Sequence, residues 1–363
     1  MLKVKLLNAM NSNIPNKLFS ILFVFLIITS DAQNQWTKER ANEWQKKHGW
    51  LVGCNYINAS SINQLEMWQA ETFNPKEIDK ELALAESIGF NFVRVFLHDV
   101  AWKQDSTGFK KRIFEFLSIC EKHKIKVMFV FFDDCWYGNP QPGKQPNPAP
   151  GLHNSGWLQS PSFAVKKDPS QWNTLQYYVK DIVKTFANDQ RVIIWDLYNE
   201  PGNNDFHSDN LPLCKSILKW VKEVNPSQPI TFGIWQLGNP LYRDITNFQL
   251  LNSDVISFHN YAKYENMNKD IANYKSFGRP VICTEYLART FNSNFDPILG
   301  LLKQENVGAV NWGLVSGKSQ TMFPWDAPLN GTEPTIWHHD LFRKDGAPFN
   351  AKEIEYIKKL TGK

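Results

Sequence analysis

Two glutamates, each placed just after a short apolar run, are the residues of this chain best suited to acid–base chemistry. Glu200 follows the β-branched and apolar run at residues 191–197 and directly precedes Pro201. Glu285 ends a second run at residues 281–284. Proline cannot donate a hydrogen bond within a central strand, so Pro201 indicates that a strand ends here. Two carboxyl groups that meet at strand ends can supply the proton donor and the stabilising or attacking carboxylate that hydrolysis of a glycosidic bond requires.

Further polar or aromatic residues follow the other apolar runs. A guanidinium such as that of Arg94 would keep one carboxylate ionised, while burial raises the pKa of the other so that it can act as the acid. Simpler explanations stay open, namely a structural ion pair for Arg94, a hydrogen-bonded core position for His259 and packing for Trp312. The candidates at these strand ends are Arg94, Asp133, Asp134, Asn199, His259, Tyr261 and Trp312.

The elements that must position these residues alternate along the chain. Apolar runs typical of buried strands alternate with stretches whose apolar positions keep the three-to-four spacing of a helix. Such alternation predicts parallel strands joined by right-handed crossovers, and eight strands predict a single-domain (β/α)8 TIM barrel over residues 49–363. The strands are expected at residues 50–56, 92–97, 127–132, 191–197, 230–235, 255–259, 281–285 and 309–312, and the helices at 75–88, 109–123, 171–188, 209–224, 297–305 and 351–360.

An open, doubly wound sheet is the alternative fold. The first strand is not followed by the GxGxxG pattern that a dinucleotide-binding sheet would carry there, which favours the barrel. In a barrel the carboxyl ends of all strands surround one mouth, so the residues above would converge.

Long connections follow the first, third and eighth strands. Those at residues 133–161 and 313–350 are too long for simple turns, and ordered loops of this length are usually functional. The alternative for the first of them is a flexible proline-rich linker. We expect Asp134, Trp136 and Trp325 from these loops to contact substrate.

The N-terminus has the pattern of a secretory signal. Lys3, Lys5 and Lys17 precede an apolar run at residues 18–28, and small residues follow up to Ala32. We expect a signal peptide at residues 1–32, a lead-in with a short helix at residues 33–48, and a secreted or periplasmic protein. An uncleaved N-terminal anchor is the alternative.

Charge and cysteine content narrow the partners. The chain has 40 Lys and Arg against 36 Asp and Glu, and removal of residues 1–32 leaves 37 against 35. This balance argues against nucleic acid or a membrane surface as partner and suits a neutral substrate such as an oligosaccharide or polysaccharide. A monomer is expected, although the sequence carries no signal for the oligomeric state. Five cysteines without CxxC spacing allow at most two disulfides and predict neither a metal site nor a cofactor. The pair His338-His339 is expected to pack at the surface or in a loop.

Five motifs resemble those of the clan A glycoside hydrolases, closest to the cellulase and mannanase family, family 5. The strand-four signature at residues 195–201 and Thr284-Glu285-Tyr286 carry most of the likeness. The other three are Val93-Arg94-Val95, Phe258-His259-Asn260-Tyr261 and Asn311-Trp312-Gly313.

The resemblance implies a retaining enzyme. Glu200 would be the acid/base and Glu285 the nucleophile. Asn199 would bind the sugar 2-hydroxyl, Arg94 and Tyr261 would contact the nucleophile, His259 would lie beside the substrate, and Trp312 would form the floor of the subsite next to the cleaved bond. The family usually has a histidine at the end of strand three, whereas this chain has Phe131-Phe132-Asp133-Asp134. The sugar therefore stays open among glucan, mannan and xylan types.

Two other functions are compatible with a barrel. A metal-dependent barrel hydrolase would carry His-x-His at the end of the first strand, and residues 50–56 contain no histidine. A glycan-binding barrel that has lost catalysis remains the alternative to the hydrolase.

Overall fold

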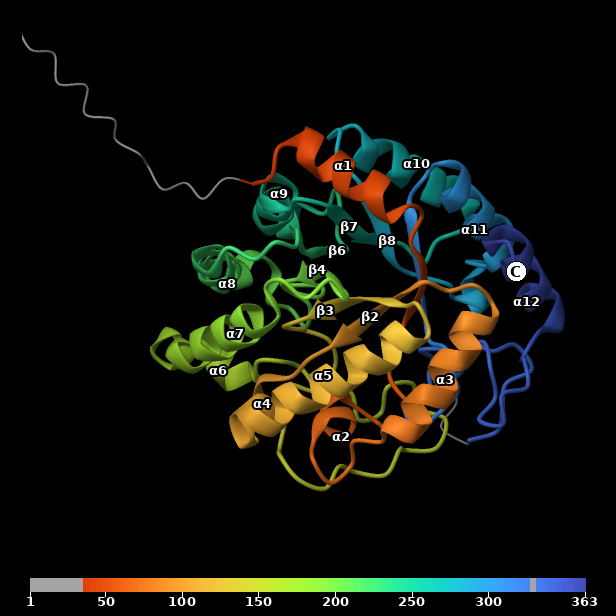
Figure 1. The fold of residues 1–363 in the computed structure, drawn as a ribbon, viewed down its shortest axis with the longest axis horizontal. Coiled ribbons are helices and arrows are strands. Elements are labelled where there is room, and N and C mark those ends of the chain that lie inside the picture. Colours follow the sequence, from red (N-terminus) through yellow and green to blue (C-terminus); the bar gives the residue numbers. More distant parts are fainter. Residues whose placement is uncertain (1–34, 327–330) are drawn as a thin grey trace, which may run out of the picture. The chain divides into compact units, whose positions relative to one another are not determined.

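The computed structural model describes residues 35–326 and 331–363, and Figure 1 shows its fold. The predicted signal peptide at residues 1–32 lies outside this part. No helix among the described residues combines the length and the apolar character needed to cross a membrane.

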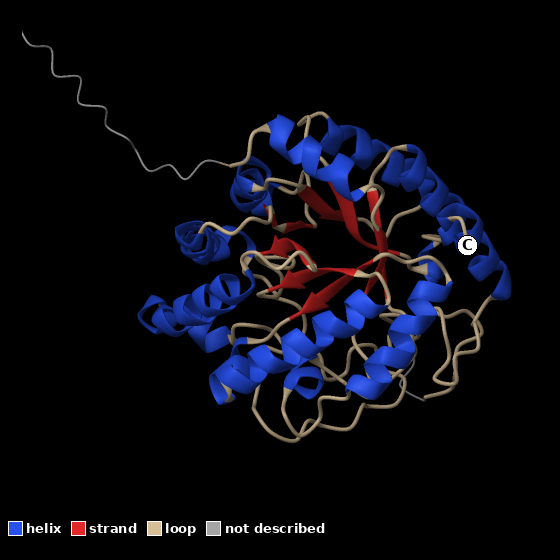
Figure 2. Ribbon diagram, in the orientation of Figure 1, coloured by secondary structure: helices blue, strands red, loops and turns tan. Residues whose placement is uncertain are grey.

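The strands form a parallel barrel, which confirms the predicted fold class. Hydrogen-bonded neighbours follow the order β5-β4-β3-β2-β1-β9-β8-β7-β6, visible as the central red arrows of Figure 2. Only Phe232 separates β5 from β6, and these two short pieces pair with β4 and β7 respectively. The two pieces correspond to the single fifth strand predicted from sequence. Counted as one strand, they complete a barrel of eight strands. The bounds are β1 Val52–Asn55, β2 Phe92–Phe96, β3 Lys126–Val130, β4 Val192–Asp196, β5 Ile230–Thr231, β6 Gly233–Ile234, β7 Ile256–His259, β8 Val281–Tyr286 and β9 Gly308–Trp312.

Helices surround the barrel on its outer side (Figure 2). Both faces of the strands are thereby covered, which explains why the strands are apolar almost throughout. The main helices are α3 Pro75–Ser87, α5 Ser106–Lys122, α7 Trp172–Phe186, α8 Leu211–Val224, α9 Arg243–Asn252, α10 Tyr264–Lys275, α11 Phe295–Gln304 and α12 Ala351–Thr361. Short helices lie in the connections: α2 Gln64–Trp68, α4 Asp99–Gln104, α6 Phe163–Lys167, η1 Pro169–Gln171, η2 His207–Asn210, η3 Pro240–Tyr242 and η4 Arg289–Phe291.

The expected helix of the lead-in is α1, Lys38–His48, and it closes the amino-terminal end of the barrel. Thr37 caps its first turn by accepting a hydrogen bond from the backbone of Arg40. Trp44 packs into the apolar cluster inside the barrel, together with Leu51 and side chains such as Phe92. One end of the barrel is thus filled by apolar packing, and polar residues are left for the other end.

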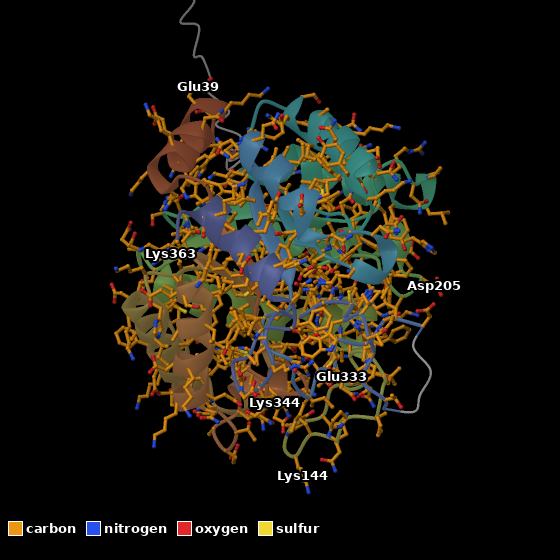
Figure 3. All side chains as sticks on the ribbon, turned by 90° about the vertical axis from the view of Figure 1, so that its right-hand side faces the viewer. Glu39, Lys144, Asp205, Glu333, Lys344 and Lys363 are labelled. Carbon is orange, nitrogen blue, oxygen red and sulfur yellow. The ribbon has the colours of Figure 1, made fainter. Side chains whose placement is uncertain are left out.

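That other end carries the long loops. Figure 3 shows Lys144, in the loop after β3, in the same lower part of the molecule as Glu333 and Lys344 of the loop after β9. The site must therefore be sought where these loops meet the carboxyl ends of the strands.

Candidate active site

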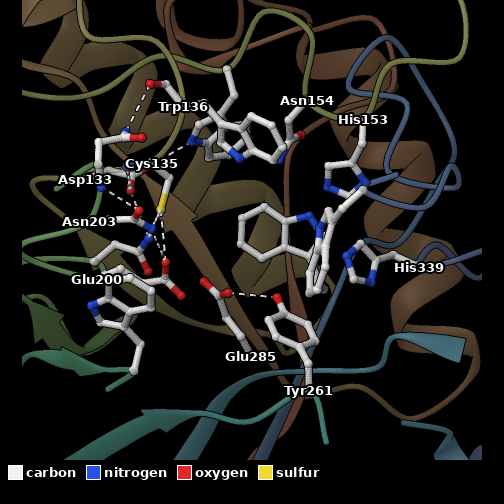
Figure 4. A pocket seen from close by; sticks show the side chains of 16 residues that line it. Asp133, Cys135, Trp136, His153, Asn154, Glu200, Asn203, Tyr261, Glu285 and His339 are labelled. Carbon is white, nitrogen blue, oxygen red and sulfur yellow. Dashed lines mark hydrogen bonds between the residues drawn. The ribbon is translucent and has the colours of Figure 1, made fainter. Parts of the chain in front are cut away.

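Glu200 and Glu285 lie close together at the mouth of the barrel, as predicted from their positions at the ends of the fourth and seventh predicted strands. One carboxylate oxygen of each lies within 4.8 Å of the other. His259, at the end of β7, bridges them: its Nδ1 lies 2.7 Å from Glu200 Oε1 and 3.4 Å from Glu285 Oε2. Figure 4 shows both carboxyl groups at the cavity that the loops enclose.

Glu285 is held by two donors that favour its ionised form. Arg94 Nη1 donates to Glu285 Oε1 at 2.9 Å, and the Tyr261 hydroxyl donates to Oε2 at 2.8 Å. Burial raises the pKa of Glu285, and Glu200 raises it further, while His259, Arg94 and Tyr261 act in the opposite direction. Because like charges resist joint ionisation, the carboxyl group beside the guanidinium is the one that ionises first.

Arg94 is fully buried, and its guanidinium group donates hydrogen bonds to four side chains, one of which is Glu285. Its Nη2 lies 2.7 Å from Asp196 Oδ2 on β4, and it also donates to Asn55 and Asn199. A buried guanidinium needs such a complete set of acceptors. Arg94 therefore lies beneath the carboxylates as an ion-pair partner and does not line the cavity, and the same holds for His259.

Glu200 has donors around it but no guanidinium. The Cys135 thiol lies 3.2 Å from Oε2, and Asn203 Nδ2 donates to the same oxygen at 2.8 Å. Burial raises the pKa of Glu200, and these two hydrogen bonds and the more distant charge of Arg94 only partly oppose that effect. The two carboxyl groups thus have different surroundings, the arrangement that separates a general acid from an ionised partner.

The backbone at Glu200 is held in an unusual conformation. Its φ is 43°, in the left-handed region that costs a non-glycine residue of order 1–3 kcal/mol. The following turn is anchored by Asp134, which accepts hydrogen bonds from Gly202 N at 2.8 Å and Asn210 Nδ2 at 2.6 Å. The strain aims the carboxyl group at the cavity, and the anchored turn maintains it.

Asp134 was expected to contact substrate, and the structure corrects this. Its carboxylate is fully buried and also bonds the Tyr198 hydroxyl and the Lys166 ammonium group. The neighbouring Asp133 lines the cavity instead, accepting from Trp157 Nε1 at 2.6 Å and Asn199 Nδ2 at 2.9 Å. Burial raises the pKa of Asp133 to about 6.

The cavity has a volume of about 390 Å³, within the range of ligand sites. Of the residues predicted to bind substrate, Asn199, Tyr261, Trp136, Trp312 and Trp325 line it together with both glutamates. Asp133, a candidate at the end of the third strand, also lines it. Residues that the sequence did not single out complete the lining: Cys135, His153, Asn154, Trp157, Asn203, Asn204, Trp235 and His339.

The missed residues differ in how far the sequence could have revealed them. Asn203 and Asn204 closely follow the motif around Glu200, which is a usable signal. His153 and Asn154 lie deep in a loop whose path no local pattern predicts. His338 and His339 were expected to pack at the surface or in a loop. Both are buried within the loop after β9, and His339 also reaches the cavity.

Among the described residues, the group that could offer three ligand atoms to a metal ion is Glu200, His259 and Glu285. Its chemistry does not fit a resident cation, because Arg94 places a positive charge 2.9 Å from Glu285 Oε1 and Tyr261 donates to the other oxygen. The arrangement of side chains therefore favours acid–base and nucleophilic chemistry carried out by the side chains themselves.

Comparison with known proteins also indicates a glycoside hydrolase. The model of the family described as Cellulase (glycosyl hydrolase family 5) matches residues 51–318. A β-glucuronidase of Paenibacillus borealis is 25% identical over 134 residues, which are 33% of this chain and 21% of that protein, so the chain spans about a fifth of that relative.

Solved structures share the fold. The exo-β-1,4-mannosidase Op5Man5 from Opitutaceae bacterium strain TAV5 has a TM-score of 0.59 and 18% identity, covering 86% of this chain and 59% of that chain. The endo-1,4-β-mannanase of Rhizomucor miehei has a TM-score of 0.56 and 11% identity, covering 85% of this chain and 96% of that chain. Since the family model spans most of the chain, this protein belongs to the cellulase family, glycosyl hydrolase family 5.

Proposed function

We propose that this protein is a retaining β-glycoside hydrolase in which Glu285 is the nucleophile and Glu200 the acid/base. The observation that carries the assignment is the unequal surroundings of the two carboxyl groups. Arg94 and Tyr261 both donate to Glu285, whereas a thiol, an amide and the His259 ring contact Glu200 and no guanidinium donates to it. The ionised group attacks, and the group that keeps its proton gives it up to the leaving oxygen.

In the first step a Glu285 oxygen attacks the anomeric carbon. The bond from that carbon to the glycosidic oxygen breaks, and the Glu200 proton moves to the departing oxygen. In the second step the Glu200 carboxylate takes a proton from water, the water oxygen attacks the anomeric carbon, and Glu285 leaves as a carboxylate. One carboxyl oxygen of each residue lies within 4.8 Å of the other. Such an approach fits a retaining pair, whose carboxyl groups are about 5–5.5 Å apart, better than an inverting pair at about 6.5–9.5 Å.

The lining supports a neutral, β-linked sugar as substrate. Within the described residues it contains no Lys or Arg, so a uronate carboxylate would enter without a cationic partner. Five tryptophans offer apolar faces for the C–H side of a pyranose, of which Trp312 at the end of β9 is proposed as the floor beside the cleaved bond. A mannose-type glycan is the first candidate, because the structures compared above include a mannosidase and a mannanase.

The proposal extends to export. It rests on the basic, apolar and small-residue pattern of residues 1–32 alone. Recovery of the protein in the extracellular or periplasmic fraction, with an N-terminus near Gln33, is the expected outcome.

A panel of aryl β-glycosides tests the function directly. Wild-type protein should hydrolyse at least one of the mannoside, glucoside and xyloside and leave the glucuronide intact, while Glu285→Gln should be inactive on all of them. Binding of a glycan without turnover by the wild type would instead identify a barrel that has lost catalysis.

A further inference from the structure

One side of the cavity is lined by what we call the loop wall, defined as His153 and Asn154 from the loop after β3 and Trp325 and His339 from the loop after β9. Figure 4 shows His153 and His339 together on one side and Glu200, Cys135 and Asn203 on the other, with Glu285 and Tyr261 between them. The wall residues lie close to Tyr261, since the centroid of the Tyr261 ring is 5.2 Å from that of Trp325 and 5.6 Å from that of His339.

The two loops that build the wall are bonded to each other. Asn154 N donates to Ser319 O at 2.9 Å, and Gln320 Nε2 donates to Leu152 O at 2.9 Å. His153 Nδ1 lies 2.8 Å from Phe323 O. Loop segments about 170 positions apart thus form one structure across the mouth, and its buried members His153, Asn154 and His339 are each at most 3% exposed. A wall held in this way is part of the resting shape of the site.

The loop after β1 supports the wall from behind. Asn63 Nδ2 donates to Gly156 O at 2.9 Å, and Gln64 Nε2 donates to Leu158 O at 3.0 Å. Lys318 N donates to Ala59 O at 2.9 Å. Three of the loops at this end therefore interlock, which leaves little freedom for the wall to swing away from the cavity.

The wall presents hydrogen-bond acceptors. A carbonyl oxygen only accepts, so the contacts of His153 Nδ1 with Phe323 O and of His339 Nδ1 with Leu287 O place the ring proton on Nδ1 and leave Nε2 as the acceptor. Burial lowers the pKa of His153 to about 4 and that of His339 well below its usual value, so both rings stay neutral. Asn154 Oδ1 is buried without a hydrogen-bond partner among the described residues.

The proposed chemistry tells which end of a glycan faces this wall. The acid/base stands on the side of the leaving group, so the sugars after the cleaved bond extend past Glu200, Asn203 and Trp235. In this mechanism the sugar that Glu285 attacks would lie on Trp312, whose ring centroid is 6.5 Å from that of His339, and its far end would face His153 and His339. A further sugar on that side would need the space that the interlocked loops occupy.

We infer from this geometry that the enzyme is exo-acting: it removes single sugars from the non-reducing end, because the loop wall fills the next position and its acceptors bind the hydroxyl groups of the terminal sugar. The inference rests on the proposed function and adds the position of cleavage. It also assigns His153, Asn154, Trp325 and His339 as specificity-determining residues.

The test uses a β-1,4-linked tetrasaccharide of the sugar accepted in the aryl glycoside panel, labelled at its reducing end. Exo-action predicts a free monosaccharide and a labelled trisaccharide as the first products. It also predicts no cleavage of the same tetrasaccharide blocked by a 4,6-O-benzylidene group on its non-reducing sugar. A labelled disaccharide as an early product, or cleavage of the blocked substrate, would overturn the inference while leaving the glycosidase function in place. Failure to cleave any aryl glycoside of the panel and any β-1,4-linked tetrasaccharide of mannose, glucose or xylose would overturn both the exo-action and the glycosidase function.

Two variants test the wall itself. Asn154 has a φ of 50°, so Asn154→Gly removes the side chain without backbone strain, and Trp325 is 40% exposed, so Trp325→Ala spares the core. Each variant should lower kcat/KM on the aryl β-glycoside at least tenfold, mainly through a higher KM. The acidic and alkaline limbs of the pH profile of kcat/KM should stay in place. Tyr177→Ala, a substitution of a 69% exposed ring on α7, is the control and should stay within twofold. Values within twofold for both wall variants would contradict contact between the wall and the sugar.

Discussion

The thiol of Cys135 lies 3.2 Å from Glu200 Oε2, so a cysteine contacts the carboxyl group that we propose as the acid/base. Burial raises the pKa of Cys135 well above its usual value, which keeps the thiol protonated and able to donate. Donation stabilises the charged form of Glu200 and thus lowers its pKa relative to what burial alone would give. Cys135 is therefore a positioning residue that tunes the acid/base.

The first prediction concerns this contact. Cys135→Ala removes a donor to the carboxylate, so the pKa of Glu200 should rise and the alkaline limb of kcat/KM should move upward by about 0.5–1 pH unit, the equivalent of about 1 kcal/mol. Cys135→Ser keeps a donor and should leave the limb near its original place. An alkaline limb that is the same in the alanine variant as in the wild type would contradict the tuning role.

The second prediction concerns Arg94, which pairs with Asp196 and Glu285 at 0% exposure. Arg94→Met leaves both carboxylates without their cation and should lower the free energy of unfolding by about 3–5 kcal/mol, measured by urea denaturation. Arg94→Lys keeps the charge but not the planar fork, and should retain more stability while losing most activity. Arg343→Lys, at a surface ion pair with Glu333, is the control and should cost less than about 1 kcal/mol. Equal stability of the two buried variants and the control would contradict the network.

The third prediction distinguishes the roles of the two glutamates by how strongly the activity of each variant depends on the leaving group of the substrate. Glu200→Ala should lose about 10²–10⁴-fold on natural glycosides, which need protonation, and far less on a dinitrophenyl glycoside, which does not. Added azide should restore turnover by reaching the space that Glu200 leaves, and should yield the β-glycosyl azide. Glu285→Ala should be inactive on both substrates without azide. Equal losses of Glu200→Ala on both substrates would contradict its role as the acid.

The fourth prediction concerns stability and pH. Burial raises the pKa of Asp340 to about 7, so the folded state holds a proton that the unfolded chain has lost. Its contribution is fully present below about pH 4 and is lost as the pH rises through about 7. The contribution of this one group to the free energy of unfolding should fall over that window by an amount on the order of 4 kcal/mol. Buried histidines such as His153, whose pKa is lowered to about 4, contribute in the opposite direction. Compared with the wild type, Asp340→Asn should therefore make the slope of the free energy of unfolding against pH more positive, and Asp345→Asn, at an exposed position of the same loop, should not. An unchanged slope in Asp340→Asn would contradict the assignment.

Much of the barrel could be predicted from sequence because its strands are buried on both faces and its larger helices have regular apolar faces. The helices α9 and α10 were not predicted, since their sequences are largely polar; α10 buries only Met267, Ile271 and Tyr274. The fifth strand was predicted as one piece, and the structure divides it at Phe232.

The site was predictable where chemistry coincides with a strand end, as at Glu200 and Glu285. It was not predictable where adjacent residues compete, because successive residues of an extended chain point to opposite sides. Asp133 faces the cavity and Asp134 faces away, and composition does not distinguish them. The loop wall depends on contacts between loops far apart in sequence, such as His153 with Phe323, for which no local pattern exists.

The stereochemistry of the first product tests the central claim most directly. The wild-type enzyme should be incubated with an aryl β-glycoside from the panel, and the anomeric proton of the released sugar followed by NMR before mutarotation. Double displacement through Glu285 predicts that the β-anomer appears first. Initial release of the α-anomer would contradict the assignment of Glu285 as nucleophile and of the pair as a retaining one.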